Sequence, residues 1–164
     1  MSDLVPWLLT IHILTVIAAF GPSLTLAFIS AAALREPVHS LFAFRLIERL
    51  QSRLIVPLAL TLPISGGLLV WAEQLDLMAY HWLLLSIGLY IILILVALLI
   101  LVPTSRKIVK LGETLANIPA AEKTANAPTL QELKGLGLRA RKLGIFLIVM
   151  VVLIEGLMAG KPVF

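Results

Sequence analysis

Four long apolar segments dominate the pattern of hydrophobic and polar positions along the chain. They cover residues 4–34, 54–71, 78–102 and 143–160, and each is near or above the roughly 20 residues that a helix needs to cross a bilayer. The segments are continuously apolar and do not alternate, which is typical of membrane helices and not of barrel strands. We therefore predict an all-α fold, a four-helix transmembrane bundle in which residues 1–164 form one integral membrane domain.

The composition agrees with a membrane protein. Hydrophobic residues make up 60% of the 164 positions, charged residues only 13%, and the mean hydropathy is +1.07. A soluble domain of this size cannot bury so many apolar side chains in its core. The chain contains no cysteine, which excludes disulfides, thiolate metal sites and cysteine nucleophiles.

The basic residues predict the orientation of the bundle. Twelve of the 13 Lys and Arg residues lie between the first and second or between the third and fourth apolar segments. Loops rich in Lys and Arg stay in the cytoplasm, so both termini should lie outside in a multi-pass protein of the inner (cytoplasmic) membrane. The amphipathic rings that we expect at the outer interface agree with this orientation: Trp7, Trp71, Tyr80 and Trp82.

The net charge of +4 indicates which partners to expect. The basic residues lie close to the ends of the apolar segments and do not form a separate patch. Anionic lipid headgroups on the cytoplasmic side are therefore the expected partners of these residues, and nucleic acid is not.

The sequences between the apolar segments also predict local structure. Between Pro37 and Arg53, apolar positions recur at helical spacing, which predicts an amphipathic lead-in to the second helix. We expect the third helix to end around Pro103 and a flexible cytoplasmic loop to follow it. Thr129 and Glu132 have the spacing of a capping box, so the fourth helix should begin in the cytoplasm, before its span. The lead-in should direct most of its polar side chains away from its apolar face: Arg45, Glu48, Arg49 and Gln51.

Two ionisable residues within the apolar segments are the main candidates for function. Glu155 is the only formal charge well inside an apolar run, and a carboxylate there must be protonated, paired or facing water. His12 lies on the first helix at a depth similar to that of Glu155, counted from the outer surface at 1.5 Å per residue. These two side chains could meet. The simpler interpretation is that each serves packing or hydrogen bonding within the bundle.

A haem b bound through His12 is a second possibility, because imidazole is a suitable axial ligand. A second histidine at the same depth is not evident. His81 lies nearer the outer interface, and His39 should lie on the cytoplasmic side. Ser86 and Tyr90 on the third helix are candidates for hydrogen bonds between helices and suggest a polar seam in the outer half of the bundle.

Several features together resemble the family of bacterial integral membrane proteins catalogued as domain of unknown function 2269. They occur in all four apolar segments. The matching features are Leu8-Leu9-Thr10-Ile11-His12, Arg53-Leu54-Ile55-Val56-Pro57 with Gly66-Gly67, Trp82 with Ser86 and Tyr90, Pro103, and Met158-Ala159-Gly160-Lys161-Pro162.

That family is distantly similar to copper-resistance D-type membrane proteins and to J-type protoporphyrinogen oxidases, which also have a histidine on the first helix. In the J-type enzymes the corresponding histidine is associated with haem. The resemblance therefore implies that His12 is the first cofactor ligand to test. This chain departs from those proteins because it has no evident intramembrane lysine and no second histidine at matching depth.

Two functional hypotheses follow from the sequence. The first is a membrane protein without a catalytic site, which packs with another membrane protein as a small accessory or structural subunit or forms a homo-oligomer. The second is a haem- or metal-binding redox or transport protein that uses His12, with Glu155 as proton or charge partner. Phosphate-binding glycine loops, metalloprotease His–Glu pairs and nucleophile elbows are missing from the sequence, so we predict neither catalytic residues nor a metal site and favour the first hypothesis.

The predicted orientation can be tested by cysteine labelling. Because the chain has no cysteine, single cysteines introduced at Gln74 and Asn126 report their own positions without background. In intact cells, a membrane-impermeant maleimide should label the cysteine at position 74 and not the one at position 126. Labelling of both positions from the same side would contradict the orientation.

Overall fold

The computed structural model describes residues 3–119 and 127–162, and all regular structure in these residues is helical. Six α-helices and two short π-helical turns follow one another along the chain. They are α1 (Val5–Arg35), α2 (Pro37–Leu50), η1 (Gln51–Ile55), α3 (Val56–Ala72), α4 (His81–Val96), η2 (Ala97–Leu101), α5 (Val102–Ala116) and α6 (Ala127–Gly160).

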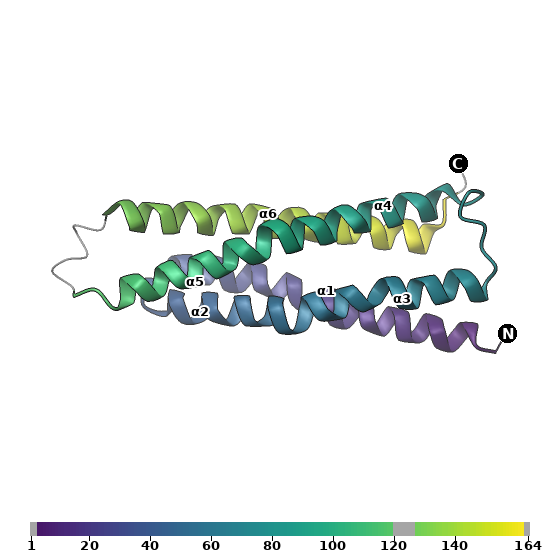
Figure 1. Cartoon of the computed structure of the whole chain (residues 1–164), viewed down its shortest axis with the longest axis horizontal. Coiled ribbons are helices and arrows are strands. Elements are labelled where there is room, and N and C mark those ends of the chain that lie inside the picture. The colour runs from purple at the N-terminus through teal and green to yellow at the C-terminus, as the bar shows by residue number, and fades with distance from the viewer. Residues whose placement is uncertain (1–2, 120–126, 163–164) are drawn as a thin grey trace.

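These elements join into four long rods. α2, η1 and α3 form one uninterrupted rod, α4, η2 and α5 form another, and α1 and α6 are rods by themselves (Figure 1). Each rod is long and apolar enough to span a membrane. The prediction of an all-α bundle with four membrane-spanning helices is therefore confirmed. The second, third and fourth rods are longer than the predicted spans because they continue beyond the apolar segments, whereas α1 keeps nearly the predicted bounds.

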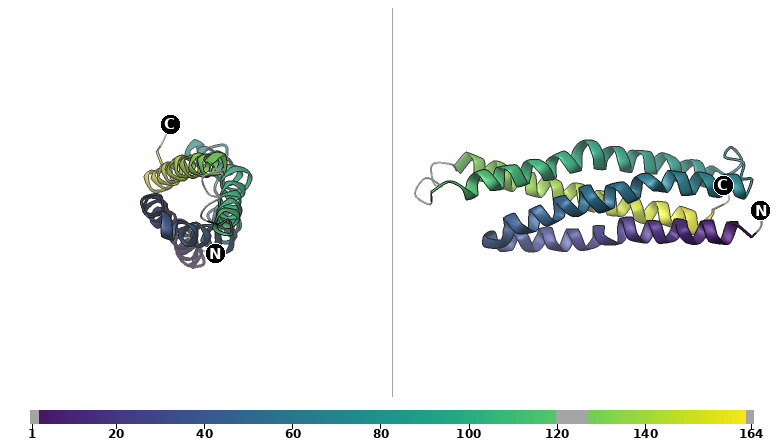
Figure 2. Two further views of the ribbon diagram at one scale, coloured as in Figure 1. Left: turned by 90° about the vertical axis from the view of Figure 1, so that its left-hand side faces the viewer. Right: turned by 60° about the horizontal axis from the view of Figure 1, so that its bottom comes forward.

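The rods surround a common axis (Figure 2). α1 packs against α2, α3 and α6, while α6 also packs against α4 and α5, and α2 packs against α5. Each rod therefore has two neighbours. Both termini and the α3–α4 connection lie at one end, which we call the terminal end (Figure 1). We call the opposite end, which holds the α1–α2 turn, the basic end.

Two prolines explain the two π-turns. Pro57 and Pro103 each stand in the first turn of an α-helix, just after a π-turn. A proline within a helix lacks an N–H and its ring clashes with the carbonyl four residues earlier. The wider π-turn relieves this conflict, because the N–H of Val56 bonds the carbonyl of Gln51 and that of Val102 bonds the carbonyl of Ala97.

The π-turn before Pro103 corrects the predicted end of the third helix. The helix does not end there but continues as α5 to Ala116, so much of the expected flexible loop is helical. The fourth helix does begin before its span, as predicted, but Thr129 is already inside α6. Glu132 does not act as a capping residue, because its carboxylate pairs with Lys107 of α5, with 2.7 Å between the charged atoms.

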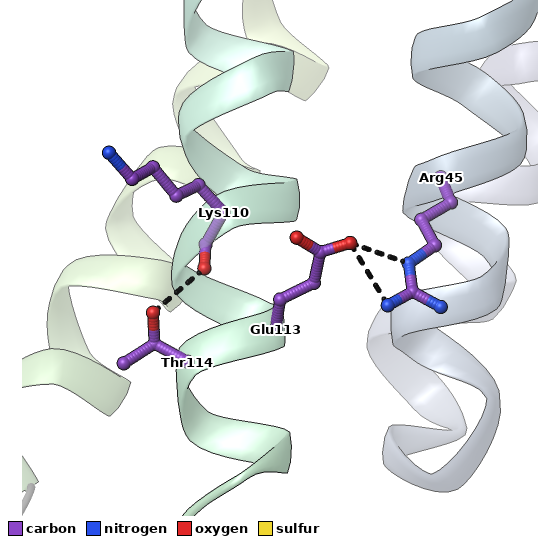
Figure 3. A network of polar contacts seen from close by, with 4 residues as sticks. All are labelled: Arg45, Lys110, Glu113 and Thr114. Atoms are coloured by element: carbon purple, nitrogen blue, oxygen red, sulfur yellow. Dashed lines mark hydrogen bonds and ion pairs between the residues drawn. The ribbon is translucent and has the colours of Figure 1, made fainter.

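Ion pairs join neighbouring rods at the basic end. The guanidinium of Arg45 on α2 binds Glu113 on α5, with Nε and one terminal nitrogen each 3.0 Å from the same carboxylate oxygen (Figure 3). Arg106 on α5 pairs with Glu48 on α2 at 3.6 Å. These pairs are partly exposed, so each contributes only about 0–1 kcal/mol, and their main effect is to fix the register of α5 on α2.

Close apolar packing sets the same register. Gly112 of α5 faces Leu41 of α2, and a Cβ atom placed on Gly112 would lie 2.8 Å from Leu41 Cδ1. Ile108 lies one turn away on α5 and is 2% exposed. The missing side chain at position 112 therefore lets the two helices approach each other.

Enlarging Gly112 should loosen this contact. We expect Gly112→Leu to lower the free energy of unfolding by about 1–3 kcal/mol, because the added side chain overpacks against Leu41. Thermal or denaturant unfolding of the purified protein in detergent measures the change. Gly135→Leu on α6 is the matched control, since a Cβ there meets nothing within 4 Å and the same substitution should cost little. Equal effects of the two substitutions would contradict close packing at Gly112.

Candidate functional site

A cavity of about 380 Å³ lies between the four rods. Its lining on α1 extends from Val16 to Ser30, which corresponds to about 21 Å along the helix axis. On α6 the lining extends from Gly137 near the basic end to Glu155 near the terminal end. The volume falls within the range of about 300–1,000 Å³ that is usual for small-molecule sites, and the shape is elongated.

The cavity wall is mainly aliphatic and aromatic, with few polar exceptions. Representative apolar residues are Phe20, Val56, Leu93 and Ile148, one from each rod. A mostly apolar wall with a small number of polar groups is the usual composition of a site for an apolar ligand. The polar residues in the wall are Ser23, Ser30, Gln51, Ser105, Arg141 and Glu155.

The two π-turns lie at the same level of the bundle. The Glu48–Arg106 ion pair joins the two rods that contain the π-turns. About one helical turn from this pair towards the terminal end, η1 lies on one rod and η2 on the other. Both π-turns supply residues to the cavity wall, including Gln51 and Leu101. π-Turns within α-helices are frequent at functional sites, which makes this level of the cavity the first place to search for one.

Gln51 is the most unusual polar residue of the wall. It is 9% exposed, and its side-chain Oε1 is buried without a hydrogen-bond partner in the described structure. A buried acceptor without a donor costs about 1–3 kcal/mol, so native proteins rarely retain one. The acceptor of Gln51 is therefore open to a donor from outside the protein chain, either water or a bound molecule.

Gln51 is an exception to the prediction that most polar side chains of the lead-in lie away from its apolar face. Gln51 follows Phe44 and Ile47 at intervals of seven and four residues, so the three side chains share one face of the helix. Phe44 and Ile47 also line the cavity. This spacing was the signal that could have identified Gln51 before the structure was known.

Glu155 lies at the terminal end of the cavity wall on α6. The side chain makes none of the hydrogen bonds or ion pairs found among the described residues. The residue is exposed, and it borders the terminal end of the cavity. An acidic group in this position is available to a molecule or ion that enters the cavity.

His12 belongs to a different part of the bundle. Its Nδ1 lies 2.7 Å from the hydroxyl oxygen of Ser65 on α3, and its ring packs beside Gly66, where a Cβ would be 3.5 Å from His12 Cε1. His12 lies one turn beyond Val16, the last cavity residue of α1 at the terminal end. No hydrogen bond joins His12 to Glu155 among the described residues, and His12 bonds Ser65 instead.

The other polar candidates bond to backbone carbonyls. The hydroxyl of Tyr90 on α4 donates to the carbonyl of Ala59 on α3. The hydroxyl of Ser86 is fully buried and donates to the carbonyl of Trp82 within α4. Tyr90 therefore links two rods across the bundle as the polar seam predicted, whereas Ser86 bonds within its own helix.

The terminal end holds the one basic residue outside the two basic regions. Lys161 Nζ lies 5.9 Å from the centre of the Trp82 ring, a cation–π contact. Both residues border a smaller cavity that also includes His81. Trp82 is only 7% exposed, whereas Trp7 and Trp71 are more than half exposed, so Trp82 serves packing more than interfacial anchoring.

The described residues contain no group of three or more His, Asp or Glu side chains that could hold a metal ion. His39 lies near the start of α2, next to the α1–α2 turn at the basic end, whereas His12 lies in the first turns of α1. His81 begins α4 and borders the smaller cavity beside Lys161. The three histidines are thus distributed over separate places and do not form one site.

Comparison with known proteins confirms the family resemblance and no more than that. No curated protein and no solved structure shows a significant match to the chain. The model of one family, described as predicted integral membrane proteins, matches residues 6–162. This match includes all four membrane-spanning rods, and the chain therefore belongs to the family catalogued as domain of unknown function 2269.

Proposed function

We propose that this chain is a non-catalytic protein of the inner membrane that works as a small accessory or structural subunit, packed against another membrane protein or a second copy of itself. Its termini face the outside, and the basic end lies against anionic headgroups at the cytoplasmic surface. Membership of an integral membrane protein family and the four membrane-spanning helices support the location.

This proposal rests on the hydrogen bonds that the polar residues near the terminal end make within the bundle. His12 bonds Ser65, and Tyr90 bonds the backbone of Ala59, so these side chains join helices. Ser86 bonds its own helix. Such bonds stabilise a membrane bundle by about 0.6 kcal/mol each and leave these groups committed to packing. A structural role therefore explains these hydrogen bonds, and no catalytic reaction is needed to account for them.

The outward faces of the bundle suit a lateral partner. Large apolar side chains on every rod are exposed, among them Phe28, Ile64, Leu99 and Val149. Exposed apolar side chains are at home in lipid, but they also let helices of another membrane protein pack by van der Waals contact. Partner binding should involve one of these faces and leave the others in lipid.

Photo-crosslinking in the native membrane tests the proposal. A photoreactive amino acid replaces Phe28, Ile64, Leu99 or Val149 in four separate variants, one for each rod. We expect a protein adduct of defined mass from one rod or from two adjacent rods, and only lipid adducts from the others. An adduct of twice the chain's mass identifies a homo-oligomer. Lipid adducts from all four positions would contradict a subunit role.

Haem binding through His12 is the second hypothesis, and the contacts of His12 do not fit it. The imidazole packs against Gly66 and is not part of the central cavity wall, and His39 and His81 lie elsewhere. The bond from Nδ1 to Ser65 is the one favourable feature, since it would leave Nε2 as the donor to iron. We therefore derive no redox step from this residue.

Absorption spectroscopy separates the two roles of His12. We expect the purified wild-type protein to lack a Soret band and His12→Ala to lower the free energy of unfolding by about 1–2 kcal/mol, through lost packing and the lost bond to Ser65. Ser65→Ala is the control, and it should cost about 0.6 kcal/mol. A Soret band in the wild type that disappears in His12→Ala would instead establish haem ligation.

A further inference from the structure

The central cavity contains a polar group that the proposed subunit role does not use. Gln51 is nine-tenths buried, and its Oε1 has no donor in the described structure. An isosteric apolar residue at this position would avoid the cost of burying the amide. Retention of an amide here is explained if a bound molecule donates a hydrogen bond to Oε1.

The space next to Gln51 indicates the shape of that molecule. From Gln51 to Ala59, the last cavity residue of that rod towards the terminal end, the wall extends about 12 Å along the helix axis. Apolar residues of all four rods line this stretch, including Phe20, Leu93 and Ile148. An apolar passage of this length accommodates a hydrocarbon chain.

The polar residues of the wall indicate where the head of the molecule lies. Ser105, which is 6% exposed, and Ser30 line the cavity on the basic-end side of Gln51, and Arg141 also contributes to the wall. Gln51 lies three residues before the second apolar segment of the sequence, near the boundary of the hydrocarbon layer. A polar head at Gln51 would place the chain along the apolar stretch from Gln51 to Ala59, while Ser23 and Glu155 add polar groups elsewhere in the wall, Glu155 at its terminal end.

The chemistry of the head follows from the groups that face it. Oε1 is an acceptor and requires a donor, which excludes an ionised carboxylate as the group that meets it. The guanidinium of Arg141 in the same wall disfavours an ammonium head. A hydroxyl fits, because it donates one hydrogen bond to Oε1 and can accept another from a neighbouring donor.

We propose that the central cavity binds a membrane-soluble, single-chain alcohol, whose hydroxyl donates to Gln51 Oε1 at the level of the π-turns and whose chain extends towards the terminal end. The π-turns contribute to the site because they place Gln51 and Leu101 in the wall at this level. The site is complete within one chain and does not depend on the proposed subunit role.

Two probes of equal size test the hydrogen bond. Decan-1-ol and 1-methoxynonane contain the same atoms, but only the alcohol can donate. Each is added to the purified full-length protein in detergent at a series of fixed probe-to-detergent ratios, and the thermal unfolding midpoint is recorded, since a ligand that binds the folded state raises it. We expect the alcohol to reach half of its effect at about tenfold lower concentration than the ether.

A variant and a matched control assign the preference to Gln51. Gln51→Met keeps the length of the side chain and removes the acceptor, so the two probes should become equivalent. Gln131→Met makes the same change at an exposed position of α6 and should keep the tenfold preference. Without a probe, Gln51→Met should also raise the unfolding midpoint, because it removes an unsatisfied buried acceptor.

Three results would overturn the proposal. They are equal effects of alcohol and ether on the wild type, no stabilisation by either probe, and a preference for the alcohol that persists in Gln51→Met. The first two need only the wild-type protein, so they decide the matter even if Gln51→Met fails to fold. Since the assay uses the isolated chain, its failure is distinct from a failure to find a crosslinked subunit partner.

Discussion

The hydrogen-bonding requirement of the peptide group in hydrocarbon is the constraint on which the rest of this structure depends. Lipid supplies no donors or acceptors, so each membrane-spanning segment must satisfy its backbone internally as a helix. Pro57 and Pro103 interrupt that pattern because each removes one N–H. At these two prolines the helix widens into a π-turn and then resumes as an α-helix, whereas Pro22 and Pro63 lie inside α-helices without one.

This response to proline has consequences for the interior of the bundle. α2 and α5 are held in register by the Arg45–Glu113 ion pair and by the close approach of Leu41 to Gly112. That register brings the two π-turns to one level, where their residues line the central cavity. The site that we propose around Gln51 thus arises from local backbone geometry together with helix packing.

The polar residues of the bundle fall into two groups with different roles. His12 and Tyr90 are paired with Ser65 and with the Ala59 carbonyl, so their hydrogen bonds hold helices together. Gln51 and Glu155 line the cavity, and neither has a protein partner in the described structure. The first group is consistent with a structural protein, whereas Gln51 is the residue on which our proposal of a bound alcohol rests.

The sequence alone was sufficient for the number of spanning helices and the all-α class, because long apolar runs in a bilayer have almost no alternative to the helix. It failed at Pro103, where a proline normally ends a helix, because the π-turn that rescues the helix has no recognised sequence pattern. The sequence also predicted that His12 and Glu155 lie at a similar depth in the membrane, but it did not show that their side chains have different neighbours. Depth follows from the number of residues along a helix, whereas the direction in which a side chain points depends on how the helices pack. Gln51 became a site residue only in the tertiary structure, because burial of an unpaired amide depends on how four helices pack around it.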